Sequence, residues 1–406
     1  MAGFDLTAAN AILKENYNDD LLADLVPKSH PLLYFLPKHP DFTGSLYIQP
    51  VKYGNPQAII SGSTGFASLI SNPSSSTVSR FALTTTKHYG LVQIDRETIL
   101  ATSNDEGAFV SALDFEVGNA VSEMGRDLAR QAFGSGTGTL GVVSTIALGV
   151  IVLVDPTDAV NFEVGMRLDS YTAETGGTLE DAGMVVTAVN EDSGEITVSG
   201  SATTSPGDFL FRQDSRGNEW AGLSAWIPDA APGPLDSFFS VNRSVSNRLY
   251  GQRLDASSMS LIDALHAGAM KIEKQGGSCS HIFCSFEQYG AIANAEQTQK
   301  RYPQPSAEEA KLGFAGIEVI TPYGRAMVYP DRYCPSEKIY MLSMDSWKLV
   351  SRENLVHWVN EDGTMILRTS SDDSFQGRIA SYSNMLCRNP IANLVLLNVP
   401  PPPPLG

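Results

Sequence analysis

The segments SLYIQPVKY (residues 45–53) and TVSRFALTTTKHYGLVQID (residues 77–95) are two β-rich arms that flank a tip rich in Gly, Ser, Asn and Pro. Both arms are enriched in Val, Ile, Thr, Tyr and Phe and alternate in part, which predicts strands. We therefore expect an extended β-hairpin loop over residues 44–101.

The tip of this loop carries five large apolar residues on a segment with no strand or helix pattern. A two-stranded hairpin without a covering helix cannot bury such side chains within its own subunit, so they need another surface. We expect the loop to contact a neighbouring subunit. The candidate interface residues, which also include some from the N-terminal arm, are Leu33, Phe35, Tyr47, Ile59, Ile60, Phe66, Leu69, Ile70, Arg80 and Phe81.

One long amphipathic helix is predicted directly after the loop, from Asp105 to Phe133. Its apolar residues recur at spacings of three and four, which forms one buried stripe along about seven turns. Asp105 and Glu106 lie in its first turn, where carboxylates interact favourably with the helix dipole. Gly134 to Gly138 end the helix and complete a segment at residues 102–141.

The N-terminal segment, residues 1–43, is predicted to be an arm. It contains one helix pattern from Thr7 to Asn16, followed by four prolines around the apolar run LLYFL at residues 32–36. Because proline lacks an N–H donor and disfavours helix interiors, this run is expected to be extended. It would lie either on its own subunit or on the next one.

The rest of the chain predicts four further parts. Short strands at regular spacing with glycine turns indicate an inserted all-β domain at residues 142–214. A connection at residues 215–256 leads to mixed helix and strand patterns at residues 257–350, which predict an α/β domain. Residues 351–406 are expected to form return strands and a proline-rich tail.

Composition narrows the classes of function. The 406 residues are 42% apolar, enough for sizeable cores, and carry a net charge of −17. Nucleic-acid binding depends on cationic side chains that displace counterions, so this composition argues against a sequence-reading DNA or RNA binder. Four irregularly spaced cysteines predict buried thiols rather than a disulfide framework. We see no secretory signal and no membrane span, since the longest apolar run is far below about 20 residues.

Several patterns resemble catalytic or cofactor motifs, but the helices and strands predicted around them do not fit such a motif. The glycines at 136, 138 and 141 match GxGxxG, but a helix precedes them and strands follow, which is the reverse of the dinucleotide-binding order. Cys279, His281 and Cys284 lie on one predicted strand, whose alternation turns His281 away from Cys284. Acidic pairs such as Asp155 with Asp158 fall on predicted turns. We therefore predict no catalytic, cofactor-binding or metal-binding residue, and no enzyme.

The order of these parts, with the helix at residues 105–134 and the segments SFQGR (374–378) and NPIA (389–392), resembles the major capsid protein of tailed phages. Herpesvirus capsid floors and encapsulin shells share that fold. The resemblance implies an α+β chain with an N-terminal arm, an extended β-hairpin loop and a peripheral domain built on a spine helix. It also implies an axial domain at residues 257–350, with the all-β domain as an addition.

The resemblance further implies a structural protein that self-assembles as hexamers and pentamers into a closed icosahedral shell. Such a shell encloses the phage genome without sequence-specific DNA binding, belongs to the virion, and is assembled in the host cytoplasm. Scaffold, portal and decoration proteins are the partners it implies. Some family members link loop lysines to asparagines covalently; no signal selects Lys52 or Lys87, so no crosslink is predicted. The alternatives are an encapsulin-like compartment and a carbohydrate-binding or adhesive β-rich protein.

Overall fold

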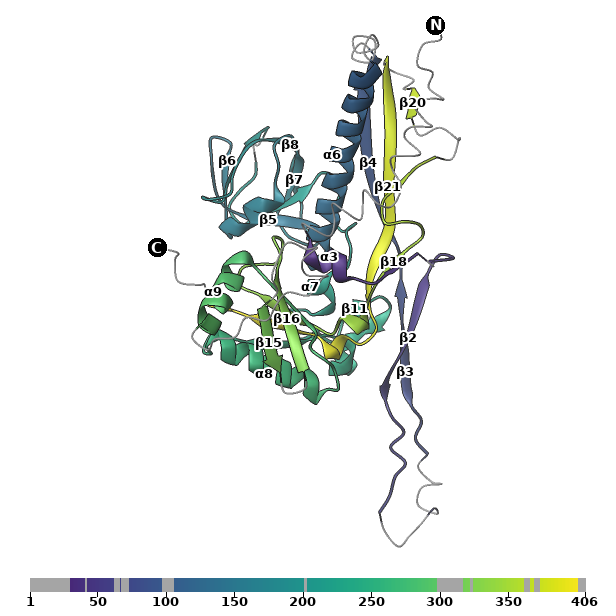
Figure 1. Ribbon diagram of the computed structural model, residues 1–406. Helices are drawn as coiled ribbons and strands as arrows, with labels where there is room; N and C mark the ends of the chain where they lie inside the picture. The colour runs from purple at the N-terminus through teal and green to yellow at the C-terminus, as the bar shows by residue number, and fades with distance from the viewer. Residues whose placement is uncertain are drawn as a thin grey trace.

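The structure is a computed structural model with long helical and strand elements arranged in four parts (Figure 1). It describes residues 30–40, 42–61, 66, 73–96, 106–200, 203–297, 317–321, 324–360, 366–368 and 373–400. The helix expected from Thr7 to Asn16 lies outside these residues. Helices and strands are mixed but grouped by part, which gives an α+β chain.

The spine helix α6 (Glu106–Phe133) lies along two long strands, β4 (Thr86–Asp95) and β21 (Ser374–Cys387) (Figure 1). Close packing holds the helix there: a Cβ placed on Gly90 of β4 would lie 3.2 Å from the Met124 terminal methyl of α6. The sheet order is β1 (Lys38–His39), β18 (Trp347–Ser351), β21 and β19 (His357–Trp358). Strand β20 (Ile366–Arg368) and β4 also pair with β21.

The expected second arm, residues 77–95, is two strands rather than one. Strand β3 (Thr77–Leu83) pairs with β2 (Tyr47–Gly54) to form the hairpin, whereas β4 pairs over ten residues with β21. The chain therefore leaves the hairpin at Thr84 and enters the peripheral sheet. Local propensity is the same on both sides of that break, so only the long-range pairing partner distinguishes the strands.

The axial domain is a six-stranded sheet with two helices, α8 (Leu261–Lys274) and α9 (Phe286–Gln297). Its strand order is β13 (Gln252–Asp255), β22 (Leu394–Leu397), β17 (Ile339–Leu342), β14 (His281–Cys284), β16 (Gly324–Pro330) and β15 (Ile317–Thr321). The range 257–350 expected for this domain is therefore wrong at both ends. It omits β13 and β22 and includes β18, which belongs to the peripheral sheet.

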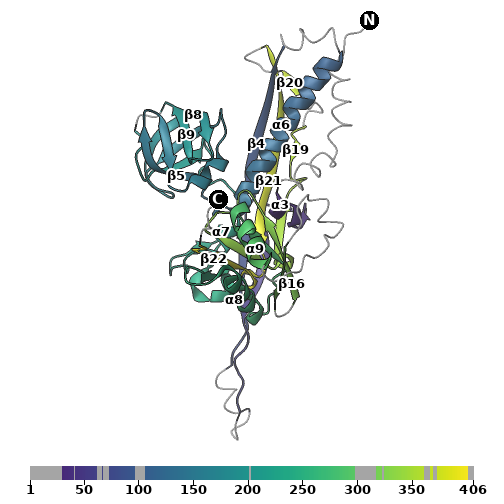
Figure 2. The ribbon, with the colours of Figure 1, turned by 60° about the vertical axis from the view of Figure 1, so that its left-hand side comes forward.

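The inserted β domain is a closed barrel with its own apolar core (Figure 2). Its strands are β5 (Thr139–Ala147), β6 (Val150–Leu153), β7 (Arg167–Tyr171), β8 (Leu179–Asn190), β9 (Glu195–Ser199) and β10 (Phe209–Arg212). They close in the order β10-β5-β6-β9-β8-β7, and the 3₁₀ helix η1 (Pro156–Asn161) packs on them. A closed barrel has no free strand edge, so this domain is self-contained.

The apolar run at residues 32–36, expected to be extended, instead lies mostly in the short helix α3 (Pro31–Phe35). Proline is favoured at the first helical position because its missing N–H needs no partner there. The helix buries Leu32 and Leu33 in the same core as the C-terminal half of α6. The remaining short elements are α7 (Leu223–Trp226), β11 (Ser237–Phe238), β12 (Val241–Asn242), η2 (Arg243–Val245), η3 (Asn247–Leu249), η4 (Met344–Ser346) and η5 (Pro390–Ala392).

Among the described helices, none combines the length and apolarity needed to span a membrane.

Candidate assembly interface

The β2–β3 hairpin projects well beyond the rest of the subunit (Figures 1 and 2). In its register Ile48 faces Ala82, Pro50 faces Arg80 and Lys52 faces Val78, so these side chains share one face, named here the outer face. Every residue of the outer face except Ala82 is exposed. The opposite face carries Tyr47, Gln49 and Val51 with Leu83, Phe81 and Ser79, and is half-buried or buried throughout.

The base of the hairpin is fixed by an aromatic cluster. The Phe81 ring lies edge-on to Trp226, with 5.0 Å between ring centroids, and Trp226 in turn contacts Phe238 at 4.9 Å. The backbone N–H of Ala82 donates to the Phe239 carbonyl at 3.0 Å. These contacts fix the orientation of the hairpin at its base.

The predicted tip residues that the structure describes are exposed. Ile59 is 82% exposed, Phe66 is 81% exposed and Ile60 is 41% exposed. Leu69 and Ile70 lie outside the described residues. Arg80 is exposed on the outer face. Sequence reasoning missed Ile48 and Val78, two further exposed apolar residues of that face, although their alternation with Phe81 and Leu83 is the signal that would find them.

The prediction needs correction for two interface residues. Leu33 and Phe81 are both fully buried within their own subunit. A side chain with no exposed surface cannot contact a neighbour. Phe35 is half-buried and packs between His281 and Tyr329, with ring centroids at 4.6 and 4.7 Å. Tyr47, also half-buried, packs against Phe42. The apolar run on the N-terminal arm thus packs mainly on its own subunit.

A buried carboxylate fastens the start of α3 to the axial domain. Asp331 accepts hydrogen bonds from the backbone N–H groups of Leu32, at 3.3 Å, and Tyr333, at 3.1 Å. Burial raises the pKa of Asp331 to about 7, although these two hydrogen bonds lower it. The neighbouring His30 ring lies 5.5 Å from that of Tyr333, and burial lowers the His30 pKa to about 4.

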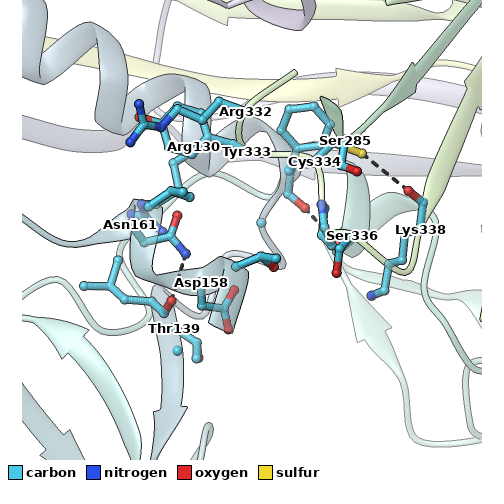
Figure 3. A pocket seen from close by; sticks show the side chains of 18 of the residues that line it. Arg130, Thr139, Asp158, Asn161, Ser285, Arg332, Tyr333, Cys334, Ser336 and Lys338 are labelled. Atoms are coloured by element: carbon cyan, nitrogen blue, oxygen red, sulfur yellow. Dashed lines mark hydrogen bonds between the residues drawn. The ribbon is translucent and has the colours of Figure 1, made fainter. Parts of the chain in front are cut away.

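A groove of about 720 Å³ lies where the barrel meets the end of α6 and the axial domain (Figure 3). Two contacts bridge barrel and axial domain: Arg332 pairs with Glu191 at 2.6 Å, and Ser336 donates to Asp155 at 3.5 Å. Asp158 also lines the groove, and its pKa is raised to about 7, mainly by burial and also by Asp155. The groove is therefore a polar junction between domains.

Ion pairs also fasten the barrel to the spine helix. Arg212 of β10 pairs with Glu123 of α6 at 2.9 Å. Just beyond the barrel, the buried Glu219 pairs with Arg130, which also pairs with Asp127 at 3.0 Å. Burial raises the pKa of Asp127, but Arg130 and Arg212 outweigh it and hold that pKa at about 2. These charges are buried as a compensated set, which holds the barrel on the helix.

The residues considered for metal or thiol chemistry form no such site. Burial raises the pKa of the Cys279 thiol to about 12 and that of Cys284 further, so neither is primed as a nucleophile. Over the described part of the chain, no three His, Cys, Asp or Glu side chains gather in a way that could hold a metal ion.

A family profile described as "SU10 major capsid protein" matches residues 212–400, which begin where the last barrel strand ends and include the axial domain and β21. The structure is similar to the capsid asymmetric unit of cyanophage A-1(L), with a TM-score of 0.56, 10% identity, and coverage of 91% of this chain and 93% of that one. Residues 212–400 therefore match the major capsid protein family of tailed phages, and the whole chain has the capsid fold. These matches support a structural capsid shell protein, a class of protein that is not an enzyme.

Other capsid structures resemble the capsid protein more weakly. The capsid of a native GTA particle gives a TM-score of 0.49 at 7% identity, covering 92% of this chain and 91% of that one. A chain from Mycobacterium phage Ogopogo gives 0.44 at 12% identity, with 91% and 92% covered. Among curated proteins, no sequence matches the capsid protein. The expected capsid fold is confirmed, and the encapsulin alternative is not favoured.

Proposed function

We propose that the capsid protein builds its shell by laying the β2–β3 hairpin across a neighbouring subunit. The observation that carries this proposal is the exposure of Ile59 and Phe66 on a hairpin that projects beyond the other described parts of its subunit. A two-stranded ribbon is marginal alone, and exposed apolar side chains at its end favour association. The interface residues proposed are Ile59, Ile60, Phe66, Leu69, Ile70 and Arg80, with Tyr47 and Phe35 at the margin.

The assembly proposed is a closed icosahedral shell of hexamers and pentamers around the phage genome, formed in the host cytoplasm. Rings require heterologous contacts, in which one surface meets a different surface of the next copy, and a projecting hairpin supplies such a contact. The genome is enclosed without sequence-specific binding, consistent with a net charge of −17. Scaffold, portal and decoration proteins are proposed partners, and no Lys52 or Lys87 crosslink is proposed.

The domain division proposed keeps the parts expected from the sequence and moves their limits to the observed elements. The hairpin ends at Leu83, and the peripheral domain combines α6 with β4, β18 and β21. The axial domain takes β13 and β22 in addition to the elements from α8 to β17. The inserted domain is the barrel from Thr139 to Arg212.

The test is a double substitution at the tip, Ile59→Asp with Phe66→Asp. Both side chains are exposed in the subunit, so the subunit should fold with an unchanged unfolding transition. Burying two carboxylates in an apolar contact is unfavourable, so shells should be absent by negative-stain microscopy. Leu235→Asp, at a similarly exposed apolar position away from the tip, is the control and should still assemble. Normal shells from the double variant would refute the proposed contact.

A further inference from the structure

The hairpin is depleted of negative charge to a degree that the rest of the chain does not share. From Phe42 to Ile94 the sequence contains no Asp or Glu, while Lys52, Arg80 and Lys87 are cationic. The whole chain has 45 carboxylates in 406 residues, about one in nine, so a run of this length would be expected to hold five or six.

The barrel has the opposite bias. Residues 139–214 contain twelve carboxylates and two arginines and no lysine, so this part has a net charge of −10 out of −17 for the chain. The axial segment 252–350, by comparison, has eleven carboxylates and ten cations, a net charge of −1. The negative charge of the subunit is therefore concentrated on one domain rather than spread evenly.

Several charges on both parts have no ion-pair partner among the described residues. Lys52 and Arg80 lie on the outer face of the hairpin, and neither makes an ion pair with any described residue. On the barrel, Asp192 and Glu195 flank the β8–β9 turn and Asp214 follows β10. Their carboxylates likewise form no hydrogen bond or ion pair within the described part of the chain.

We propose that the outer face of the hairpin docks on the barrel of a neighbouring copy, with Lys52 and Arg80 against barrel carboxylates. The contact forms between copies, because hairpin and barrel of one subunit lie apart in both views (Figures 1 and 2). Ile48 and Val78 surround the two cations with apolar surface, so the ion pairs would be partly shielded from solvent. Complementary charge speeds encounter and fixes the register of the docked strand. This inference rests on the proposed function of the hairpin and names its partner surface.

Two neutralised variants test it, one on each side of the contact. The hairpin variant is Lys52→Gln with Arg80→Gln, and the barrel variant is Asp192→Asn with Glu195→Gln and Asp214→Asn. Assembly of purified subunits is followed by light scattering. Each variant should assemble about ten-fold more slowly than the parent at low salt. The difference should vanish near 1 M salt, where the screening length is about 3 Å.

The combined five-residue variant decides whether the two sides meet. If they do, removing the second set of charges after the first slows assembly little further. The combined variant then assembles about as slowly as the slower of the hairpin variant and the barrel variant. Lys271→Gln with Lys274→Gln, exposed on α8, is the control for net charge and should assemble as the parent does. Rates that multiply in the combined variant, or a barrel variant that assembles like the parent, would overturn the docking site.

This outcome is separable from failure of the proposed function. If the Ile59→Asp, Phe66→Asp variant fails to assemble while the charge variants assemble normally, the hairpin contact stands and the barrel is not its partner. If that tip variant also assembles normally, both are refuted. All charge substitutions lie at exposed or half-exposed positions, and an unchanged unfolding transition verifies that the subunit is folded.

Discussion

The hairpin and the barrel are both β structures that project from the body of the subunit, but they bury apolar side chains in opposite ways. The barrel closes on itself and has an internal core that includes Ile151, Leu168, Ile196 and Leu210. The hairpin has two strands, buries only its base, and leaves Ile59 and Phe66 exposed at its far end.

This difference separates stability from assembly. A closed barrel satisfies its strand edges and folds around its own core without a neighbour, so its acidic surface residues are not needed for that core. The hairpin has only two strands, and it leaves the apolar side chains of Ile59 and Phe66 exposed to solvent. These side chains therefore favour contact with another molecule. Changes in the hairpin base, or in the ion pairs that hold the barrel on α6, should therefore alter subunit stability. Changes at the hairpin tip should instead alter shell formation.

The largest effect should come from the hairpin base. Phe81→Ala removes a fully buried ring that packs on Trp226 and should lower the free energy of unfolding of the unassembled subunit by about 3–5 kcal/mol. Phe66→Ala, the same change at the exposed tip, should shift it by less than about 0.5 kcal/mol. Denaturant titration of both variants measures this. Equal losses would mean that the tip also packs on its own subunit.

The ion pairs that hold the barrel on α6 should show the next largest effect on the free energy of unfolding. Glu219→Ala leaves the buried Arg130 with Asp127 as its remaining carboxylate partner and should cost about 3 kcal/mol, measured in the same way. Asp229→Ala breaks the exposed pair with Lys338 and should cost less than about 1 kcal/mol. If the two variants lose equal stability, burial does not set the strength of the ion pairs that hold the barrel on α6.

A pH dependence should distinguish the barrel from the hairpin, which has no carboxyl group. The pKa of Asp158 in the folded protein is about 7, above the ordinary 3.8, because burial and Asp155 disfavour its ionisation. Its contribution to stability is therefore complete below about pH 4 and is lost as pH rises through 7. Asp158→Asn cannot ionise, so the stability of the parent relative to this variant should fall over that interval.

Unfolding measured at several pH values between about 4 and 8 gives this difference directly. Subtraction matters because the buried His30 and His88, whose pKa values are lowered to about 4, change stability in the opposite sense. Asp192→Asn, which removes an exposed carboxylate of the same barrel, is the matched control for the substitution itself. A parent-minus-Asp158→Asn difference that does not change with pH would show that Asp158 is not shielded from water.

The same contrast explains what the sequence could reveal. The barrel was predictable because its strands are local and separated by glycine turns, and α6 was predictable from its periodic apolar stripe. The split between β3 and β4 was not, since β4 pairs with β21 almost 300 residues away and Thr84 and Thr85 carry no turn signal. Burial of Leu33 and Phe81 also depends on such distant partners. The charge contrast was readable from the sequence by counting charged residues segment by segment.

The smallest effect should be a gain in subunit stability, from a substitution at the β5–β6 turn of the barrel. Leu148 is fully exposed and has φ of 52°, a left-handed conformation that is unfavourable for leucine, and Gly149 follows with φ of 80°. Asn-Gly is the preferred pair for such a turn, so Leu148→Asn should stabilise the subunit by about 0.5 kcal/mol. Leu179→Asn, exposed on a strand with ordinary φ, should give no gain. A loss of stability or of shell formation in Leu148→Asn would instead assign this turn, like the hairpin tip, to a contact between subunits.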